Sequence, residues 1–254
     1  MIAALVRPDV YFCYATGALW AVALTFYGIR IASRGVFHSD RVTKIGGTAM
    51  FGRGLMDATY WAIEPLVRGL SALGITPNGL TWSALVLGLG AGAALAFGWF
   101  GLATLLATMS TIGDILDGQV ARLTNRGSIR GELLDAAVDR YTEFAFLAGL
   151  VLTLRDSWWQ VSLALGATLA SFMISYASAK AEALQVTPPR GLMRRHERAI
   201  YLIAGIAAVP LVGPILVARD LPYVAPCLVS LGLVAVIGNL AAVLRLVRIA
   251  RALR

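Results

Sequence analysis

Four aspartates lie within apolar stretches of the chain at helical spacings. Asp114 and Asp117 are three residues apart, and Asp135 and Asp139 are four apart, so each pair shares one face of a helix. An ionised carboxylate inside a membrane span costs about 2.5 to 3.5 kcal/mol on insertion scales and therefore marks a functional site. Grouped carboxylates repel one another unless they are neutralised, and their oxygens suit Mg²⁺ or Mn²⁺. The pattern predicts a metal site, with two ions if the site handles phosphoryl groups.

Small residues accompany the aspartates where a bulky ligand would need room. Gly118 directly follows the second aspartate, Gly131 lies one turn before the third, and Ala121 continues the small face. Taken singly, each would be explained by helix packing, but beside a carboxylate cluster they favour a ligand pocket. Arg122, at the predicted membrane edge, either binds a phosphate bidentately or serves as a charged anchor.

The elements that position these residues must be membrane helices. Hydrophobic residues make up 58% of the 254 residues and charged residues only 14%, which is too apolar for a soluble domain. A spanning helix needs about 20 mostly apolar residues, and seven segments qualify. They are approximately Val10–Ile29, Leu80–Trp99, Leu102–Ala121, Leu133–Leu154, Trp158–Ala181, Ala199–Ala218 and Tyr223–Leu244. We therefore predict an all-α integral membrane protein.

The two aspartate pairs fall on consecutive predicted helices. The link between these helices, Leu123–Arg130, is short. Helices joined by so short a link are normally antiparallel neighbours. We therefore expect the four carboxylates to face one another across a single helix pair.

A different kind of segment, Met50–Leu70, lies between the first span and the other six. Its charged residues recur at intervals of four, seven and four and would share one helical face. These residues are Arg53, Asp57, Glu64 and Arg68. The apolar residues fall largely elsewhere, which predicts a helix lying in the membrane interface with a bend at Pro65. An ordinary connector is the alternative interpretation.

The charge of the chain gives an orientation. The net charge is +8, which suits anionic headgroups or phosphate ligands; too few polar residues remain to build a nucleic-acid-binding surface. All but Arg7, Arg155 and Arg219 of the 22 Lys and Arg residues fall on one side of the predicted bundle. The positive-inside rule makes that side cytoplasmic, and the aspartates lie near it.

Eight of these residues together form a longer pattern. It reads DxxDGxxAR, eight residues, then GxxxDxxxD, and resembles the signature of the CDP-alcohol phosphotransferase family at every specified position. The TPNxLT sequence that often precedes the first core helix of that family is matched by residues 76–81. The eight residues are Asp114, Asp117, Gly118, Ala121, Arg122, Gly131, Asp135 and Asp139.

The resemblance implies roles for these residues. Asp114, Asp117 and Asp135 would bind metal, and Asp139 would bind metal or act as general base on the acceptor hydroxyl. The implied reaction joins a CDP-linked lipid to a polar alcohol and releases CMP, with Mg²⁺ or Mn²⁺ as cofactor. The residues that would shape the nucleotide site are Asn78, Thr81, Gly118, Ala121, Arg122 and Gly131.

The resemblance also implies an organisation of the chain. Residues 76–254 would form a six-helix catalytic core, usually dimeric, in a bacterial inner membrane. Residues 1–35 would add an extra N-terminal membrane helix, and residues 36–75 would form a linker with the interfacial helix.

The acceptor is indicated by shorter features. Asn125, Gly127 and Ser128 in the link, with Arg140 directly after the last aspartate, resemble phosphatidylinositol and inositol-phosphate enzymes. Ser178 departs from that resemblance, because a basic residue is expected there. A bunched basic group suits a phosphate on the acceptor; it comprises Arg190, Arg194, Arg195 and Arg198. We predict inositol or inositol phosphate, with glycerol 3-phosphate, serine and an amino alcohol as alternatives.

Two other classes of membrane protein use buried carboxylates. A cation transporter would typically show repeats with broken helices, and the two halves of this sequence show no repeat. A membrane prenyltransferase resembles NDxxDxxxD arranged twice, whereas here Gly113 precedes Asp114 and the cluster is single and split. Both are weaker interpretations than a phosphotransferase.

Overall fold

The structure is a computed structural model that describes residues 2–39, 42–43, 53–187, 191 and 193–253. Within these residues the named elements are all α-helices and no strand occurs, so the predicted all-α class is confirmed. The helices are α1 (Ile2–Arg34), α3 (Gly54–Ala72), α4 (Pro77–Ala96), α5 (Phe100–Leu123), α6 (Ile129–Thr153), α7 (Trp158–Ala183), α8 (Arg195–Val217) and α9 (Ala225–Ala252). Each predicted span coincides with one of them, to within a few residues at most ends.

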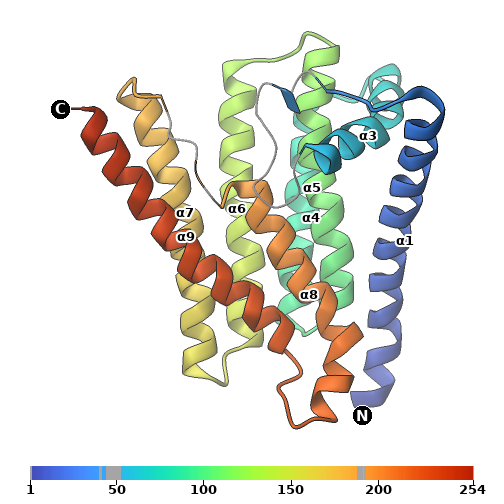
Figure 1. The fold of residues 1–254 in the computed structure, drawn as a ribbon, viewed down its shortest axis with the longest axis vertical. Helices are drawn as coiled ribbons and strands as arrows, with labels where there is room; N and C mark the ends of the chain where they lie inside the picture. The colour runs from blue at the N-terminus through green and yellow to red at the C-terminus, as the bar shows by residue number, and fades with distance from the viewer. Residues whose placement is uncertain (1, 40–41, 44–52, 188–190, 192, 254) are drawn as a thin grey trace.

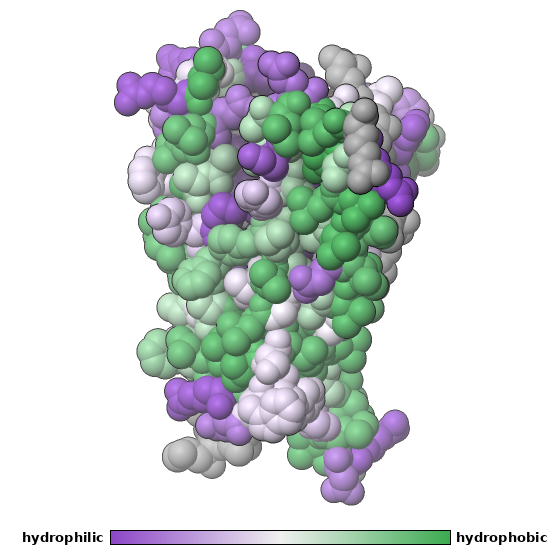
Figure 2. Space-filling model, turned by 90° about the vertical axis from the view of Figure 1, so that its left-hand side faces the viewer, coloured by the Kyte–Doolittle hydropathy of each residue, from purple (hydrophilic) through white to green (hydrophobic). Residues whose placement is uncertain are grey.

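The helices form an upright bundle with an apolar belt. Six of them, α1, α4, α5, α7, α8 and α9, are long and apolar enough to cross a membrane. Helix α6 has 25 residues but carries Asp139, Arg140 and Glu143 in its middle, which lowers its apolar content. Hydrophilic residues gather at the two ends of the face seen in Figure 2, with a largely hydrophobic band between them. The chain is an integral membrane protein.

The six core helices, α4 to α9, pack against one another in pairs. Helix α4 lies against both α5 and α6, while α7 packs on α9 and α6, and α8 bridges α9 and α5. A single apolar cluster runs through these helices and includes the fully buried Leu95, Leu147, Ile206 and Leu231. This packing holds α5 and α6, which carry the aspartates, on opposite sides of α4 (Figure 1).

Glycines allow the backbones of α4 and α6 to come into contact where the two helices cross. A Cβ at Gly92 would lie 2.3 Å from the carbonyl oxygen of Ala145, and one at Gly149 would lie 2.2 Å from the carbonyl oxygen of Gly92. At Gly88 a Cβ would lie 2.2 Å from a Thr142 methyl group. Small residues at such crossings are the usual means of helix association in lipid. Here they fix α6 against α4 below the aspartates.

Polar caps define where the site-bearing helices begin and end. The Thr76 hydroxyl accepts from the Gly79 N–H at 3.2 Å and starts α4, and the Ser128 hydroxyl accepts from the Gly131 N–H at 3.0 Å and starts α6. Asn125, with φ of 53°, ends α5 in the left-handed conformation that asparagine tolerates. The sequence features at Asn125 and Ser128 that we associated with the acceptor therefore have a structural role in this turn.

Helix α1 attaches to the core at its N-terminal end. The Asp9 carboxylate accepts from the N–H groups of Gly101 and Leu102 at 2.7 and 3.1 Å, which caps the first turn of α5. The Cys13 thiol lies 3.5 Å from the carbonyl oxygen of Ala207 on α8. The predicted extra N-terminal helix is thus docked against α5 and α8.

Helix α3 lies across the bundle near the C-terminal end of α1 (Figure 1). Its Ile63 and Val67 pack with Leu80, Leu116 and Val120, so it is an ordered part of the fold. It remains continuous through its one internal proline, where we predicted a bend.

The charged residues that we predicted on one face of α3 differ in exposure. Asp57 is 3% exposed, whereas Arg53 and Arg68 are exposed. The Asp57 carboxylate accepts from the Ser39 N–H at 3.0 Å and lies 3.6 Å from the His38 ring. The preceding chain supplies these partners, and a helical spacing alone does not reveal them.

The polar links reach the ends of the bundle that the charge pattern predicts. The C-terminal end of α1, the α5–α6 link, the C-terminal end of α7 and the chain's C-terminus lie at one end, and the α8–α9 link lies at the other (Figure 1). The C-terminal ends of α1 and α7, the α5–α6 link and the C-terminus of the chain therefore share one end of the bundle.

We expect Gly92→Ala to destabilise the protein because its Cβ would meet backbone that cannot move aside. Overpacking of this kind costs about 1 to 3 kcal/mol, whereas Gly→Ala in an uncrowded helix stabilises by about 1 kcal/mol. Gly232→Ala on α9, with nothing within 4 Å, is the matched control. Thermal unfolding in detergent should show a lower midpoint for the first variant only. Equal midpoints would show that the α4–α6 crossing is not tightly packed.

Candidate active site

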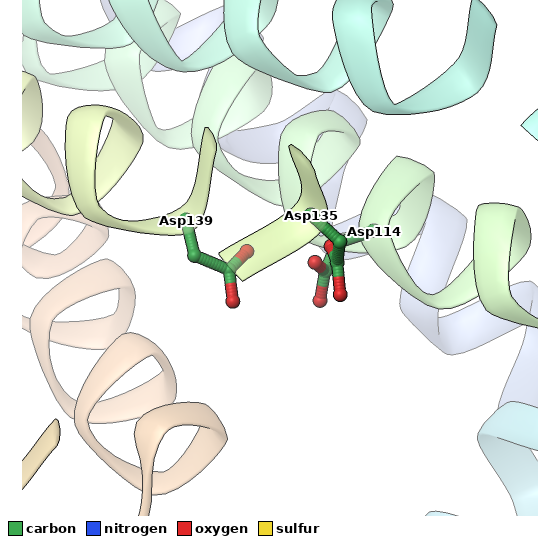
Figure 3. Close-up of side chains that lie close together, drawn as sticks. All are labelled: Asp114, Asp135 and Asp139. Atoms are coloured by element: carbon green, nitrogen blue, oxygen red, sulfur yellow. The ribbon is translucent and has the colours of Figure 1, made fainter. Parts of the chain in front are cut away.

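Three of the four aspartates converge between α5 and α6. Asp114, Asp135 and Asp139 each offer one carboxylate oxygen, and these oxygens all lie within 4.8 Å of one another. Figure 3 shows the three side chains pointing into the same space. Asp139 is buried and the other two are half-buried. An all-oxygen set of this kind fits a hard divalent cation.

The fourth aspartate has a different partner. Asp117 is buried, and its carboxylate accepts from the Thr81 hydroxyl of α4 at 2.6 Å. It lines the same cavity as Asp114 and Asp135 but lies outside the group of three. Thr81, which we predicted to bind nucleotide, thus also orients one of the carboxylates.

An arginine from α8 balances part of the negative charge. The Arg195 guanidinium donates from Nη1 to both oxygens of Asp114, at 3.0 and 3.1 Å, and its Nη2 pairs with Asp139. Hydrogen bonds between an arginine and a carboxylate are charge-assisted and are about twice as strong as neutral ones. Arg195 therefore belongs to the carboxylate cluster, at the junction of three helices.

A second ion-pair network lies behind the first. Arg198 is fully buried and donates from Nε and Nη2 to Glu143 at 3.0 and 2.8 Å, and from Nη1 to the carbonyl oxygen of Met193 at 2.9 Å. Arg140 donates to the other Glu143 oxygen at 3.2 Å and also contacts the Ser175 hydroxyl. This network fastens the start of α8 to α6 and α7.

Sequence analysis missed Glu143 as a member of the site. The residue lies four positions after Asp139 and eight after Asp135, so it continues the same helical face. A fifth carboxylate in an apolar stretch is the signal that could have identified it.

The predicted nucleotide-binding residues line one cavity of about 1490 Å³ together with Asp114, Asp117 and Asp135. They are Asn78, Thr81, Gly118, Ala121, Arg122 and Gly131. A smaller cavity of about 80 Å³ shares Asp114, Asp117 and Arg195 with it and is also lined by Asp139 and Glu143. The sequence pattern is thus assembled in space, although its binding roles stay predictions.

Two of the small residues leave room for polar neighbours. A Cβ at Gly118 would lie 3.3 Å from Nη1 of Arg122, so the glycine lets this guanidinium fold back over α5. A Cβ at Gly131 would lie 3.5 Å from the Asn78 side-chain oxygen. The approach of Gly131 to Asn78 places the first turns of α4 and α6 together at the rim of the cavity.

The predicted acceptor arginines that the structure describes have different partners. Arg190 lies outside the described residues, and Arg194 is the N-cap of α8, where its N–H donates to Glu197 at 3.0 Å. We expected Arg195 and Arg198 in a polar loop, but α8 begins at Arg195, well inside the bundle (Figure 1). Both arginines are tolerated there because carboxylates of α5 and α6 pair with them.

Fold and site together define a polytopic helical membrane protein with an acidic, arginine-balanced centre in a large cavity. Residues 74–226 match the CDP-alcohol phosphatidyltransferase family. Because this match covers more than half of the chain, the chain belongs to the CDP-alcohol phosphatidyltransferase family, a family of membrane enzymes. The resemblance that we inferred from eight residues is confirmed.

Similar proteins extend this result. A phosphatidylinositol phosphate synthase of Mycobacteroides abscessus is 34% identical over 153 residues, which are 56% of this chain and 66% of that protein, just under two thirds of its length. Crystal structures of Mycobacterium tuberculosis phosphatidylinositol phosphate synthase are also similar. The complex with manganese and citrate has a TM-score of 0.65 at 26% identity and covers 73% of this chain and 87% of that one. The complex with CDP-DAG has a TM-score of 0.63 and covers 73% and 92%.

We expect Arg198→Met to destabilise the fold, because it breaks a buried ion pair and leaves Glu143 with one partner fewer. Such a change costs about 3 to 5 kcal/mol. Arg130→Met, at an exposed arginine of α6, is the control. Thermal unfolding in detergent should separate the two variants. If Arg198→Met instead kept its stability and lost only acceptor affinity, Arg198 would be an acceptor residue as its sequence position first indicated.

Proposed function

We propose that this protein transfers a phosphatidyl group from a CDP-linked lipid, such as CDP-diacylglycerol, to the hydroxyl of a polar alcohol and releases CMP. The observation that carries the proposal is the group of three carboxylates, Asp114, Asp135 and Asp139, within 4.8 Å of one another in an apolar bundle. The family match and the similarity to a synthase solved with CDP-DAG support the same reaction.

The donor fits the larger cavity. Its rim carries Arg122 and Arg126, which are suited to a diphosphate, and its depth is apolar. Asn78 and Gly131 lie side by side at the rim, where a nucleotide base or ribose would meet the first turns of α4 and α6. The lipid part of the donor can then remain within the bilayer.

The carboxylate ligands fit a divalent cation. Asp114, Asp135 and Asp139 would hold Mg²⁺ or Mn²⁺, with Asp117 beside them, and the similar synthase was crystallised with manganese. A bound divalent ion supplies charge stabilisation to a diphosphate and to the departing CMP. We propose two ions, as the sequence pattern indicates.

The chain's own residues supply the remaining chemistry. Asp139 borders the smaller cavity beside Asp114 and Arg195, where a carboxylate can take the proton from an attacking hydroxyl. Thr81 holds Asp117 in place through its 2.6 Å hydrogen bond. Attack of the hydroxyl oxygen on phosphorus breaks the bond to CMP, so no covalent enzyme intermediate is needed.

The acceptor we propose is inositol phosphate. The relatives named phosphatidylinositol phosphate synthase support it, as does the exposed part of Arg195 beside the carboxylates, where a guanidinium can bind a phosphate. Inositol, glycerol 3-phosphate, serine and an amino alcohol are the acceptors to test against it.

We further propose that the site faces the cytoplasm of a bacterial inner membrane and that the protein is a homodimer. The excess of basic residues at the end of the bundle that carries the α5–α6 link supports the orientation. The family resemblance supports the dimer.

We expect Asp114→Asn, Asp117→Asn and Asp135→Asn each to reduce CMP release from CDP-diacylglycerol by at least about 10²-fold, since each removes a charge from a site that lipid leaves with few alternatives. The assay supplies Mg²⁺ and a panel of the five acceptors, with Glu132→Gln as control because Glu132 lines the cavity outside the group of three. A wild-type protein that releases no CMP with any acceptor would refute the proposed function.

Asp139→Asn should separate binding from chemistry. We expect transfer to fall by about 10² to 10⁴-fold while CDP-lipid affinity stays nearly intact, because a general base is needed only when the hydroxyl attacks. Turnover rates and equilibrium binding of the donor measure the two effects. Parallel losses of rate and affinity would identify Asp139 as mainly a metal ligand.

Arg195→Ala should raise the KM for inositol phosphate by about tenfold or more and the donor KM much less, because a charge-assisted phosphate contact contributes about 1.5 to 3 kcal/mol. The KM for unphosphorylated inositol serves as the internal control. Unchanged acceptor kinetics would show that Arg195 compensates the charge of the carboxylates and does not bind the acceptor phosphate.

A further inference from the structure

One face of α1 lines the large cavity that also contains Asp114 and Asp117. The lining residues of α1 are Cys13, Thr16, Gly17, Trp20 and Leu24. Their intervals of three, one, three and four residues place them on a single helical face. The only hydroxyl among them, on Thr16, donates to the carbonyl oxygen of Phe12 at 2.9 Å, so this face presents an apolar wall.

Helix α8 supplies the opposing wall with the same pattern. Its lining residues include Ile200, Ile203, Ala204, Ala207 and Leu211, again at intervals of three, one, three and four. The cavity that contains Asp114 and Asp117 therefore continues between two apolar helix faces. Its polar part and its apolar part belong to one space.

Contacts hold α1 at both ends of this stretch. Toward its N-terminus, Asp9 caps α5 through Gly101 and Leu102. Toward its C-terminus, the Tyr27 ring lies 5.5 Å from the Trp61 ring of α3. Helix α1 thus spans the side of the cavity as a fixed wall, beside α8 (Figure 1).

The length of the α8 wall suits an acyl chain. The α8 wall from Ile200 to Leu211 rises by about 16 Å at 1.5 Å per residue. One leaflet contributes about 15 Å of hydrocarbon, half of a core of roughly 30 Å. An acyl chain that begins near the aspartates would therefore run along this wall toward the contact between the Cys13 thiol and the Ala207 carbonyl oxygen, where α1 meets α8.

We propose that α1 encloses one acyl chain of the CDP-linked lipid donor between itself and α8. This inference rests on the proposed function. It concerns an element outside residues 74–226, the part that matches the family, so it assigns a substrate-binding role to the part of the chain that the family core does not include. Helix α1 then makes donor affinity depend on the acyl chain as well as on the nucleotide.

Two glycines of α1 provide a matched test. A Cβ at Gly17 or at Gly28 has nothing within 4 Å, but only Gly17 is among the residues that line the cavity. We expect Gly17→Phe to raise the KM for CDP-dioleoylglycerol by about tenfold, equivalent to about 1.4 kcal/mol, and to leave the affinity for CDP unchanged. Gly28→Phe should leave both unchanged. Equal donor KM values in the two variants would overturn the proposal.

Protection of an introduced cysteine from maleimide labelling tests whether the acyl chain lies between α1 and α8. This measurement needs no catalytic turnover. In Gly17→Cys, CDP-dioleoylglycerol should slow maleimide labelling at least about fivefold more than CDP or dioleoylphosphatidylglycerol does, a difference of about 1 kcal/mol. Gly28→Cys and the unsubstituted chain give the background. Equal protection by dioleoylphosphatidylglycerol would show that any membrane lipid fills the groove, which would overturn the proposal. Protection without CMP release in the wild-type protein would contradict the proposed function alone.

Discussion

The structure depends on the compensation of buried carboxylates by arginines in a bundle that lipid surrounds. Asp114, Asp135 and Asp139 lie close enough to repel one another strongly. Arg195 offsets this repulsion from α8, and the Arg198–Glu143 pair fixes the helix that carries Arg195. This compensation stabilises the position of α8 deep in the bundle and the approach of the three carboxylates, which α5 and α6 carry on two sides of α4.

Helix packing turns these charges into a site. Glycines at the α4–α6 crossing bring the two backbones together, and the caps formed by Thr76 and Ser128 begin α4 and α6 at the same rim. The reactive groups therefore stand on rigid helices and not on loops, which is the arrangement that keeps catalytic groups in register. Helix α1 adds a wall at the apolar end of the same cavity.

The spans and the carboxylate cluster could be predicted from sequence because both depend on local patterns, apolar length and helical spacing. The position of Arg195 inside the bundle could not be predicted, because the positive-inside rule assigns basic residues near the end of a span to a loop. The reason this arginine enters the bundle is its pairing with carboxylates of other helices. The burial of Asp57 could not be predicted either, because its partner Ser39 lies outside α3. Long-range pairing of polar groups is the information that one-dimensional patterns lack.

Electron paramagnetic resonance of Mn²⁺ in the presence of CDP can measure whether Asp114, Asp135 and Asp139 bind a divalent cation. We expect the purified protein to bind Mn²⁺ and Asp135→Ala to weaken this binding at least about tenfold, because the substitution removes a charged ligand. Glu132→Ala, three residues earlier on the same cavity wall, should bind Mn²⁺ as the wild-type protein does. Equal Mn²⁺ affinity in Asp135→Ala and the wild-type protein would contradict the account.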